Sequence, residues 1–214
     1  MELTKSKARL WSKLGSRAVF GMALFDMAER GVDFYAMSGD LVRSSGLGRF
    51  QEIFPERCIN MGIAEQNMVG VAGGMAKDGT PIFATSFAPF ITMRAAEQVR
   101  MNMGYMQLNV KTVGLGSGLV MAQLGNSHFG IEDVAVMRAI PNLTIVSPAD
   151  CGSIVKAVEA ITHHKGPVYL RLTGGPGNPV VYSEEYDFVI GKAITLREGT
   201  DVAIVAAGTM VHTA

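Results

Sequence analysis

The strongest constraint on the fold is a regular alternation of short apolar runs with longer segments of helical spacing. Turn residues, glycine above all, mark most of the boundaries between them. We predict six strands, at residues 34–37, 58–60, 81–85, 110–115, 143–146 and 168–172. Strands that are joined by helical crossovers form parallel sheets. The sequence therefore predicts an α/β fold with a doubly wound parallel sheet.

The intervening segments predict helices at residues 15–30, 64–77, 89–103, 131–140 and 151–163, with a short helix before Phe54. We place one domain at residues 1–182. Residues 183–214 are expected to be a polar connector followed by a buried strand at 201–208. One strand cannot bury itself, so we expect the chain to be a fragment that contains the start of a second, truncated α/β domain.

Composition and charge limit the classes of partner. Nineteen basic side chains balance nineteen acidic ones, so no overall field attracts nucleic acid or anionic lipid. No run of 18 apolar residues is present, and we expect a soluble, cytoplasmic protein that contacts no membrane. Cys58 and Cys151 stand far apart, and no histidine pair has metal-ligand spacing with a nearby carboxylate, so we predict no metal site within this chain.

Open α/β sheets bind ligands at the carboxyl ends of their strands, and several polar or aromatic residues are expected there. Glu65 begins the predicted helix at 64–77, where a carboxylate is ordinarily a favourable partner for the helix dipole. Phe87 and Phe90 follow a strand and could equally be core aromatics. Asp40 could be an ordinary turn aspartate, and His128 a loop histidine whose partners are backbone groups.

Several motifs favour a functional reading of these residues. The stretch Gly62-Ile-Ala-Glu-Gln-Asn67 resembles a motif of the transketolase and deoxyxylulose-phosphate synthase family. The resemblance runs from about Arg17 to residue 214 and is greatest to the separately encoded C-terminal subunits of split transketolases. Further matching stretches lie at residues 54–57, 94–100, 131–142, 147–150 and 166–171. The resemblance implies the pyrimidine domain of the thiamine diphosphate-binding fold.

The resemblance also implies roles for particular residues. Glu65 would contact the aminopyrimidine of thiamine diphosphate, where a protonated carboxyl can hydrogen-bond a ring nitrogen and favour the imino tautomer that accepts the thiazolium proton. Burial raises such a pKa and the helix dipole lowers it, so we expect burial to dominate once cofactor and partner close the site. Phe90 would stack on the pyrimidine and Phe87 line its pocket, in a loop one residue longer than in one-chain transketolases. Asp40 would lie near the cofactor.

On the substrate side, the resemblance implies that His128 hydrogen-bonds the donor or transfers a proton. It also implies that Arg17 and Ser44 hold a sugar phosphate, although a lone arginine on a helix is more often a surface residue. Three positions depart from the family: Leu124 replaces an aspartate that contacts a substrate hydroxyl, Gly116 replaces a histidine, and Gly174 replaces a phosphate-binding arginine. We therefore predict a substrate other than the standard pentose phosphates.

The family binds the diphosphate through a divalent metal held by a Gly-Asp-Gly segment, and this sequence contains none. We therefore expect a transketolase-like transferase subunit that is active only with a separate diphosphate-binding subunit. That subunit would carry the Mg²⁺ ligands, in an αβ or α2β2 assembly. Two alternatives stay open: the β-type subunit of a 2-oxoacid decarboxylating enzyme with the same cofactor, and a non-catalytic binding relative.

Overall fold

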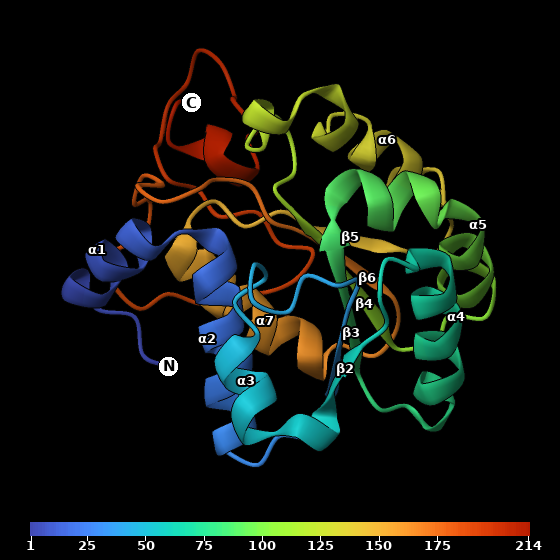
Figure 1. Cartoon of the computed structure of the whole chain (residues 1–214). Coiled ribbons are helices and arrows are strands. Elements are labelled where there is room, and N and C mark those ends of the chain that lie inside the picture. The colour runs from blue at the N-terminus through green and yellow to red at the C-terminus, as the bar shows by residue number, and fades with distance from the viewer.

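Six parallel strands form the central sheet of the computed structural model, which describes residues 1–214 (Figure 1). Their order across the sheet is β2-β1-β3-β4-β6-β5. The strands are β1 (Tyr35–Ser38), β2 (Cys58–Asn60), β3 (Ile82–Phe87), β4 (Val110–Leu115), β5 (Thr144–Val146) and β6 (Val168–Arg171). Every neighbouring pair is parallel. The predicted doubly wound α/β fold is confirmed, and the bounds of β2 and β4 match those expected.

Helices cover both faces of the sheet, as Figure 1 shows. On one face lie α1 (Lys5–Leu14), α2 (Ser16–Glu29), α3 (Gly48–Ile53) and α7 (Cys151–His163). On the other lie α4 (Glu65–Met75), α5 (Ala96–Val99) and α6 (Asp133–Arg138). Each layer encloses its own apolar core: the first is centred on phenylalanines such as Phe20 and Phe83, the second on Met68, Ile91 and the ring of Tyr169. None of the helices combines the length and apolar character that crossing a membrane requires.

Two helical segments differ from expectation. The N-terminal segment contains a separate helix, α1, which the sequence did not lead us to expect; Gly15, with φ of +83°, ends it before α2 begins. The helix predicted at 89–103 is composite, with π-helical turns at Phe90–Arg94 and Arg100–Tyr105 on either side of α5. A π turn holds more residues than an α turn. It can therefore accommodate the extra residue expected in this segment.

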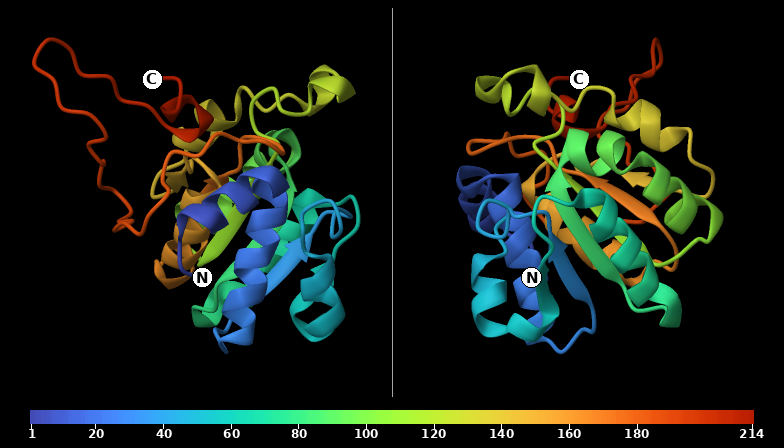
Figure 2. Two further views of the ribbon diagram at one scale, coloured as in Figure 1. Left: turned by 90° about the vertical axis from the view of Figure 1, so that its left-hand side faces the viewer. Right: turned by 45° about the vertical axis from the view of Figure 1, so that its right-hand side comes forward.

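The strand predicted at residues 201–208 does not form in this structure. Val202, Ile204 and Val205 are 77%, 68% and 93% exposed, and no strand forms between β6 and residue 214. The C-terminal segment extends away from the helices and returns above the sheet, which Figure 2 shows most clearly. It returns at the strand ends, where the amide of Gly208 donates to the carbonyl of Ser147. It does not run along a sheet edge, so it meets no row of backbone groups with which to form a ladder.

Candidate functional site

The sheet changes winding direction between β1 and β3. From β1 the chain passes to β2 on one side through α3 and then, through α4, to β3 on the other side. Such a switch point opens a crevice at the carboxyl ends of the two strands, where α/β proteins bind ligands. Gly39 directly follows β1 and Ser86 lies near the end of β3. The first residue of α4, Glu65, meets both of them.

Glu65 is buried, with 1% of its surface exposed. Ser86 Oγ donates to Glu65 Oε1 at 2.7 Å, and Arg94 Nη1 donates to Oε2 at 2.8 Å. A Cβ atom at Gly39 would lie 3.3 Å from both Oε1 and Ser86 Oγ, closer than most side-chain contacts. Glycine at this position therefore lets the carboxylate lie against the end of β1, and both of its oxygens have a donor.

Two opposing effects set the charge of Glu65. Burial raises the pKa of its carboxyl, but the hydrogen bonds from Ser86 and Arg94, together with the charge of Arg94, lower the pKa by more. The net result is a pKa below the ordinary value for glutamate. Glu65 is therefore an ionised carboxylate in this subunit at neutral pH, and a protonated Glu65 requires a change in these contacts.

Three rings lie together beside this carboxylate. The centroids of Phe87 and Phe90 are 6.0 Å apart, and the ring of His128 lies 5.3 Å from Phe87 and 5.2 Å from Phe90, all edge to face. The guanidinium carbon of Arg94 lies 4.1 Å from the centre of Phe90 and so connects the rings to Glu65. The structure thus brings Glu65, Phe87, Phe90 and His128 into one continuous cluster.

Asp40 is exposed and has a left-handed backbone, with φ of +61°. Its amide donates to Asn60 Oδ1, and Asn60 Nδ2 donates to Asp40 Oδ1, both at 3.1 Å. These bonds hold the loop after β1 to the end of β2 without a contact to Glu65. This geometry is typical of an ordinary turn aspartate, which was the alternative interpretation of Asp40. A cofactor role for Asp40 stays a prediction.

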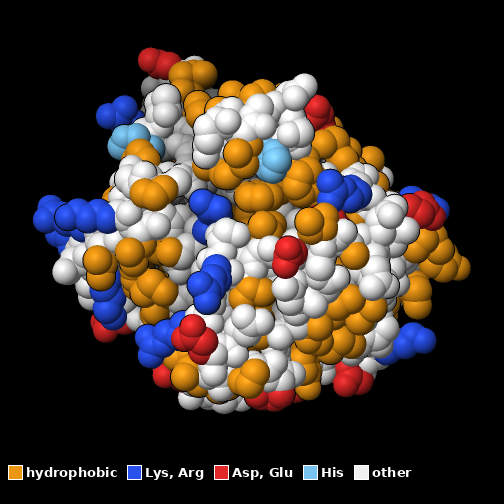
Figure 3. All heavy atoms as spheres, viewed as in Figure 1, with side chains coloured by type: hydrophobic (Ala, Val, Ile, Leu, Met, Phe, Trp, Pro, Cys, Tyr) orange, Lys and Arg blue, Asp and Glu red, His pale blue; other side chains and the backbone are white.

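Arg17 and Ser44 line a separate pocket of about 280 Å³. Arg43 and the glycine-rich turn at residues 174–176 complete part of its wall. Figure 3 shows Lys and Arg side chains scattered over the side of α1 to α3, whereas apolar side chains gather over α4 and α5. The two predicted phosphate-binding residues thus lie together, in a pocket that shares no lining residue with the Glu65 cluster.

Ser86, Arg94 and Asn60 are contact residues of the candidate site that we did not predict. A signal for Ser86 existed in its place at a strand end beside Phe87, and Arg94 begins the stretch at 94–100 that resembles the family. Nothing local indicates that Arg94 reaches Glu65, because the two are 29 positions apart on different elements.

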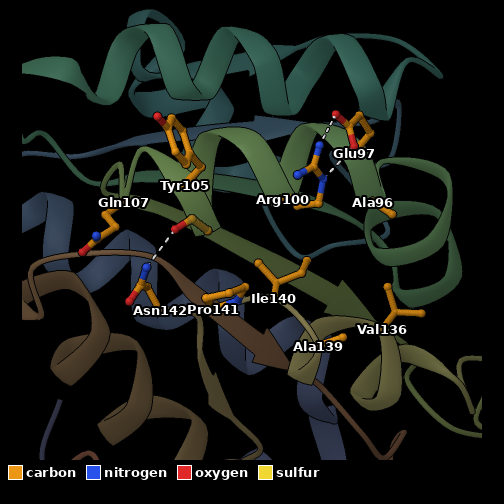
Figure 4. A pocket seen from close by; sticks show the side chains of 11 residues that line it. Ala96, Glu97, Arg100, Tyr105, Gln107, Val136, Ala139, Ile140, Pro141 and Asn142 are labelled. Atoms are coloured by element: carbon orange, nitrogen blue, oxygen red, sulfur yellow. Dashed lines mark hydrogen bonds and ion pairs between the residues drawn. The ribbon is translucent and has the colours of Figure 1, made fainter.

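A larger pocket of about 630 Å³ lies away from this cluster, between the second π turn and the segment after α6 (Figure 4). The forked pair of Glu97 and Arg100 borders it on one side, and Pro141 and Asn142 on the other. None of the predicted site residues lines it. No three His, Cys, Asp or Glu side chains come together as metal ligands anywhere in the chain.

Comparison with known proteins identifies the transketolase pyrimidine-binding domain family, which matches residues 12–175. The chain is 40% identical over 188 residues to a 6-deoxy-6-sulfo-D-fructose transketolase subunit of Clostridium sp. and 37% identical over 200 residues to an apulose-4-phosphate transketolase subunit of Phocaeicola vulgatus. These alignments cover 88% and 93% of this chain but only 58% and 64% of the two relatives, so the chain spans less than two thirds of their lengths.

A solved structure described as a split gene transketolase, inactive beta4 tetramer, superimposes with a TM-score of 0.83 at 39% identity. The superposition covers 93% of this chain and 64% of that one.

Proposed function

This chain belongs to the family of transketolase pyrimidine-binding domains, and we propose that it forms the pyrimidine side of a thiamine diphosphate site in a transketolase-like transferase. The observation that carries the proposal is the buried carboxylate of Glu65 at the switch point, next to the rings of Phe87 and Phe90. A flat aminopyrimidine needs an aromatic surface and a hydrogen-bonding carboxyl, and these residues fit both requirements.

The residues of this chain would bind and orient, while the bound cofactor would supply the nucleophilic carbon that attacks a carbonyl substrate. Glu65 would hydrogen-bond a pyrimidine nitrogen, with Phe90 stacked on the ring and Phe87 and His128 closing its edge. His128 is half-buried, and its Nδ1 lies 3.0 Å from Ser127 Oγ. Its other ring nitrogen makes no hydrogen bond within the chain, which suits a role in holding the substrate or moving a proton.

We propose that a separate diphosphate-binding subunit completes the site and carries the oxygen ligands for Mg²⁺, in an α2β2 assembly. Support comes from the names of the two relatives, which describe transketolase subunits, and from the apolar surface next to the site. On the π-helical segment that follows Phe90, Met93, Met101 and Tyr105 are 39%, 37% and 77% exposed. Large apolar side chains in such numbers on one segment are typical of surfaces that become covered by a partner.

The substrate we propose is a sugar outside the standard pentose phosphates. The names of the two relatives refer to 6-deoxy-6-sulfo-D-fructose and apulose 4-phosphate. The family resemblance also implies that three sugar-contacting side chains are replaced in this chain, at Gly116, Leu124 and Gly174. With the reconstituted enzyme, kcat/KM for xylulose 5-phosphate with ribose 5-phosphate should be far below that for a modified ketose. Efficient pentose phosphate transfer would contradict this, and activity on a 2-oxoacid alone would favour the decarboxylating alternative.

Glu65→Gln provides the direct test of the cofactor role. A glutamine side chain cannot become the neutral acid, so exchange of the cofactor C2 proton with deuterated water should fall by about 10² to 10⁴, the range for loss of acid–base assistance. The measurement is NMR of thiamine diphosphate bound, with Mg²⁺, to this chain and its partner subunit. Glu97→Gln changes an exposed glutamate and is the matched control. Wild-type exchange in Glu65→Gln would refute the role.

A further inference from the structure

We propose that Arg94 is a positioning residue that latches Glu65 in the free subunit and must leave it when the aminopyrimidine binds. This inference rests on the proposed function and concerns the order of events at that site. It starts from the occupancy of the carboxylate: Ser86 bonds one oxygen and Arg94 the other. A pyrimidine nitrogen that approaches Glu65 beside Phe90 therefore competes with a donor that already holds the carboxylate.

Of the two donors, Arg94 is the one that can move. Ser86 lies within β3 and is fully buried, so its hydroxyl is fixed by the sheet. Arg94 ends a π-helical turn and its side chain is 43% exposed, so solvent is directly available to the displaced guanidinium. An ion pair that is open to water on one side is also weaker than an enclosed pair.

The chemistry of the ring requires the same movement. An unprotonated ring nitrogen accepts a hydrogen bond, and an ionised carboxylate can only accept as well, so the two do not bond until Glu65 carries a proton. Arg94 is the charged group that acts on Glu65; from the other elements around it come the hydroxyl of Ser86 and the glycine that follows β1. When Arg94 leaves, only the hydroxyl of Ser86 and the helix terminus still oppose the effect of burial on the pKa of Glu65. The carboxyl of Glu65 is then protonated more easily.

The guanidinium also occupies the face of Phe90. Its carbon lies 4.1 Å from the ring centre, in cation–π contact, so the guanidinium fills the space that a planar ligand would need on this face. A pyrimidine that stacks on this same face of Phe90 displaces Arg94 from the ring and, because the one guanidinium makes both contacts, from the carboxylate as well. One movement vacates the aromatic face, frees a carboxylate oxygen and favours the protonated acid.

The titration of Glu65 in the isolated subunit, without cofactor, tests the latch. Glutamate labelled with ¹³C at the side-chain carboxyl is followed by NMR across pH, and Glu65→Gln assigns the signal. In Arg94→Met we expect the midpoint for Glu65 to shift to higher pH than in the wild type. Arg100→Met is the matched control, because Arg100 pairs with Glu97 on the same helical segment, and it should leave the midpoint unchanged. An unchanged midpoint in Arg94→Met would overturn the proposal.

Cofactor binding to the complex with the partner subunit provides a second measurement. When Arg94 holds Glu65, the subunit cannot bind the cofactor in the proposed way. The apparent affinity for the cofactor is therefore reduced by the fraction of subunits in which Arg94 is in place. Thiamine diphosphate with Mg²⁺ should therefore bind Arg94→Met several-fold more tightly than the wild type, and weaker binding would count against the latch. If the wild-type complex does not bind the cofactor at all, the proposed function fails, whereas the NMR titration still reports whether Arg94 controls Glu65.

Discussion

Glu65 and the two cysteines are all buried, but the pKa of Glu65 is lowered whereas the pKa values of both cysteines are raised. Glu65 has two donors on its oxygens, which outweigh the cost of burying its charge. Cys58 and Cys151 have no comparable cationic donor: burial raises the pKa of Cys58 to about 11, and burial with the nearby charge of Asp150 raises the pKa of Cys151 to about 12. Ionisation of a buried group here depends on the partners that the fold brings to it.

The cysteines give a simple prediction at this scale. Because a thiolate is the reactive form, neither thiol should react with a disulfide reagent in the native protein at pH 8, where about one in 10³ or fewer of them is ionised. Both should react at once in guanidinium chloride, and Cys58→Ser assigns the two signals. Rapid reaction of either cysteine in the native protein would show that its surroundings are more open or more cationic than described.

The loop that carries His128 depends on contacts between α6, β6 and the loop itself. Asp133, fully buried at the start of α6, accepts hydrogen bonds at Oδ2 from Tyr169 at 2.7 Å and Arg171 Nε at 2.8 Å, both from β6. At the base of the loop, the backbones of Gly118 and Gly130 exchange hydrogen bonds of 2.8 and 2.9 Å. The loop is thus closed next to a buried ion pair, which fixes where His128 can reach.

Replacing Asp133 with Ala should destabilise the protein strongly, because Arg171 would keep a largely buried charge without its partner. Breaking a buried pair in this way costs about 3 to 5 kcal/mol. Glu97→Ala breaks the exposed pair with Arg100, whose side chains are more than half exposed, and should cost at most about 1 kcal/mol. Urea unfolding of both variants provides the comparison, and equal losses would show that burial of the Asp133 pair adds nothing.

Beyond β6, the chain is first held to the domain and then released from it. Asp150, which also caps α7, accepts hydrogen bonds from the amides of Val181 and Tyr182, and the ring of Tyr182 stacks on Tyr186 at 4.0 Å. By contrast, every residue from 191 to 205 is exposed. The predicted domain boundary between residues 182 and 183 stays a prediction. The chain continues to pack against the domain past this boundary, as far as residue 190.

Limited proteolysis tests this description of the whole molecule. Trypsin needs an extended, accessible segment, so its first cuts should follow Lys192 and Arg197 and leave residues 1–192 together. Mass spectrometry at short digestion times identifies the products, and Arg197→Gln should leave the cut at Lys192 as the first one. Early cleavage inside α1, which contains several lysines, would mean that this helix is held less firmly than the segment at 178–190.

The order and type of most elements could be predicted because apolar periodicity and turn residues are local properties of the sequence. The strand expected at 201–208 is absent from this structure for the opposite reason: an apolar run becomes a strand only where a neighbour offers backbone partners, and that neighbour is not encoded in the run itself. Likewise the motif around Glu65 indicated a pyrimidine-binding carboxylate, but it could not indicate which side chains hold the carboxylate in the free subunit.

The sequence by itself determined the parallel α/β fold, the family, and the residue types gathered at the strand ends, because each follows from local pattern and motif. Only the tertiary structure decided that Arg94 lies on both Glu65 and Phe90, that His128 joins the two phenylalanine rings, and that Arg17 and Ser44 line a different pocket. These are contacts between elements distant in the chain. The charge of Glu65 depends on them, since burial and ion pairing act through space.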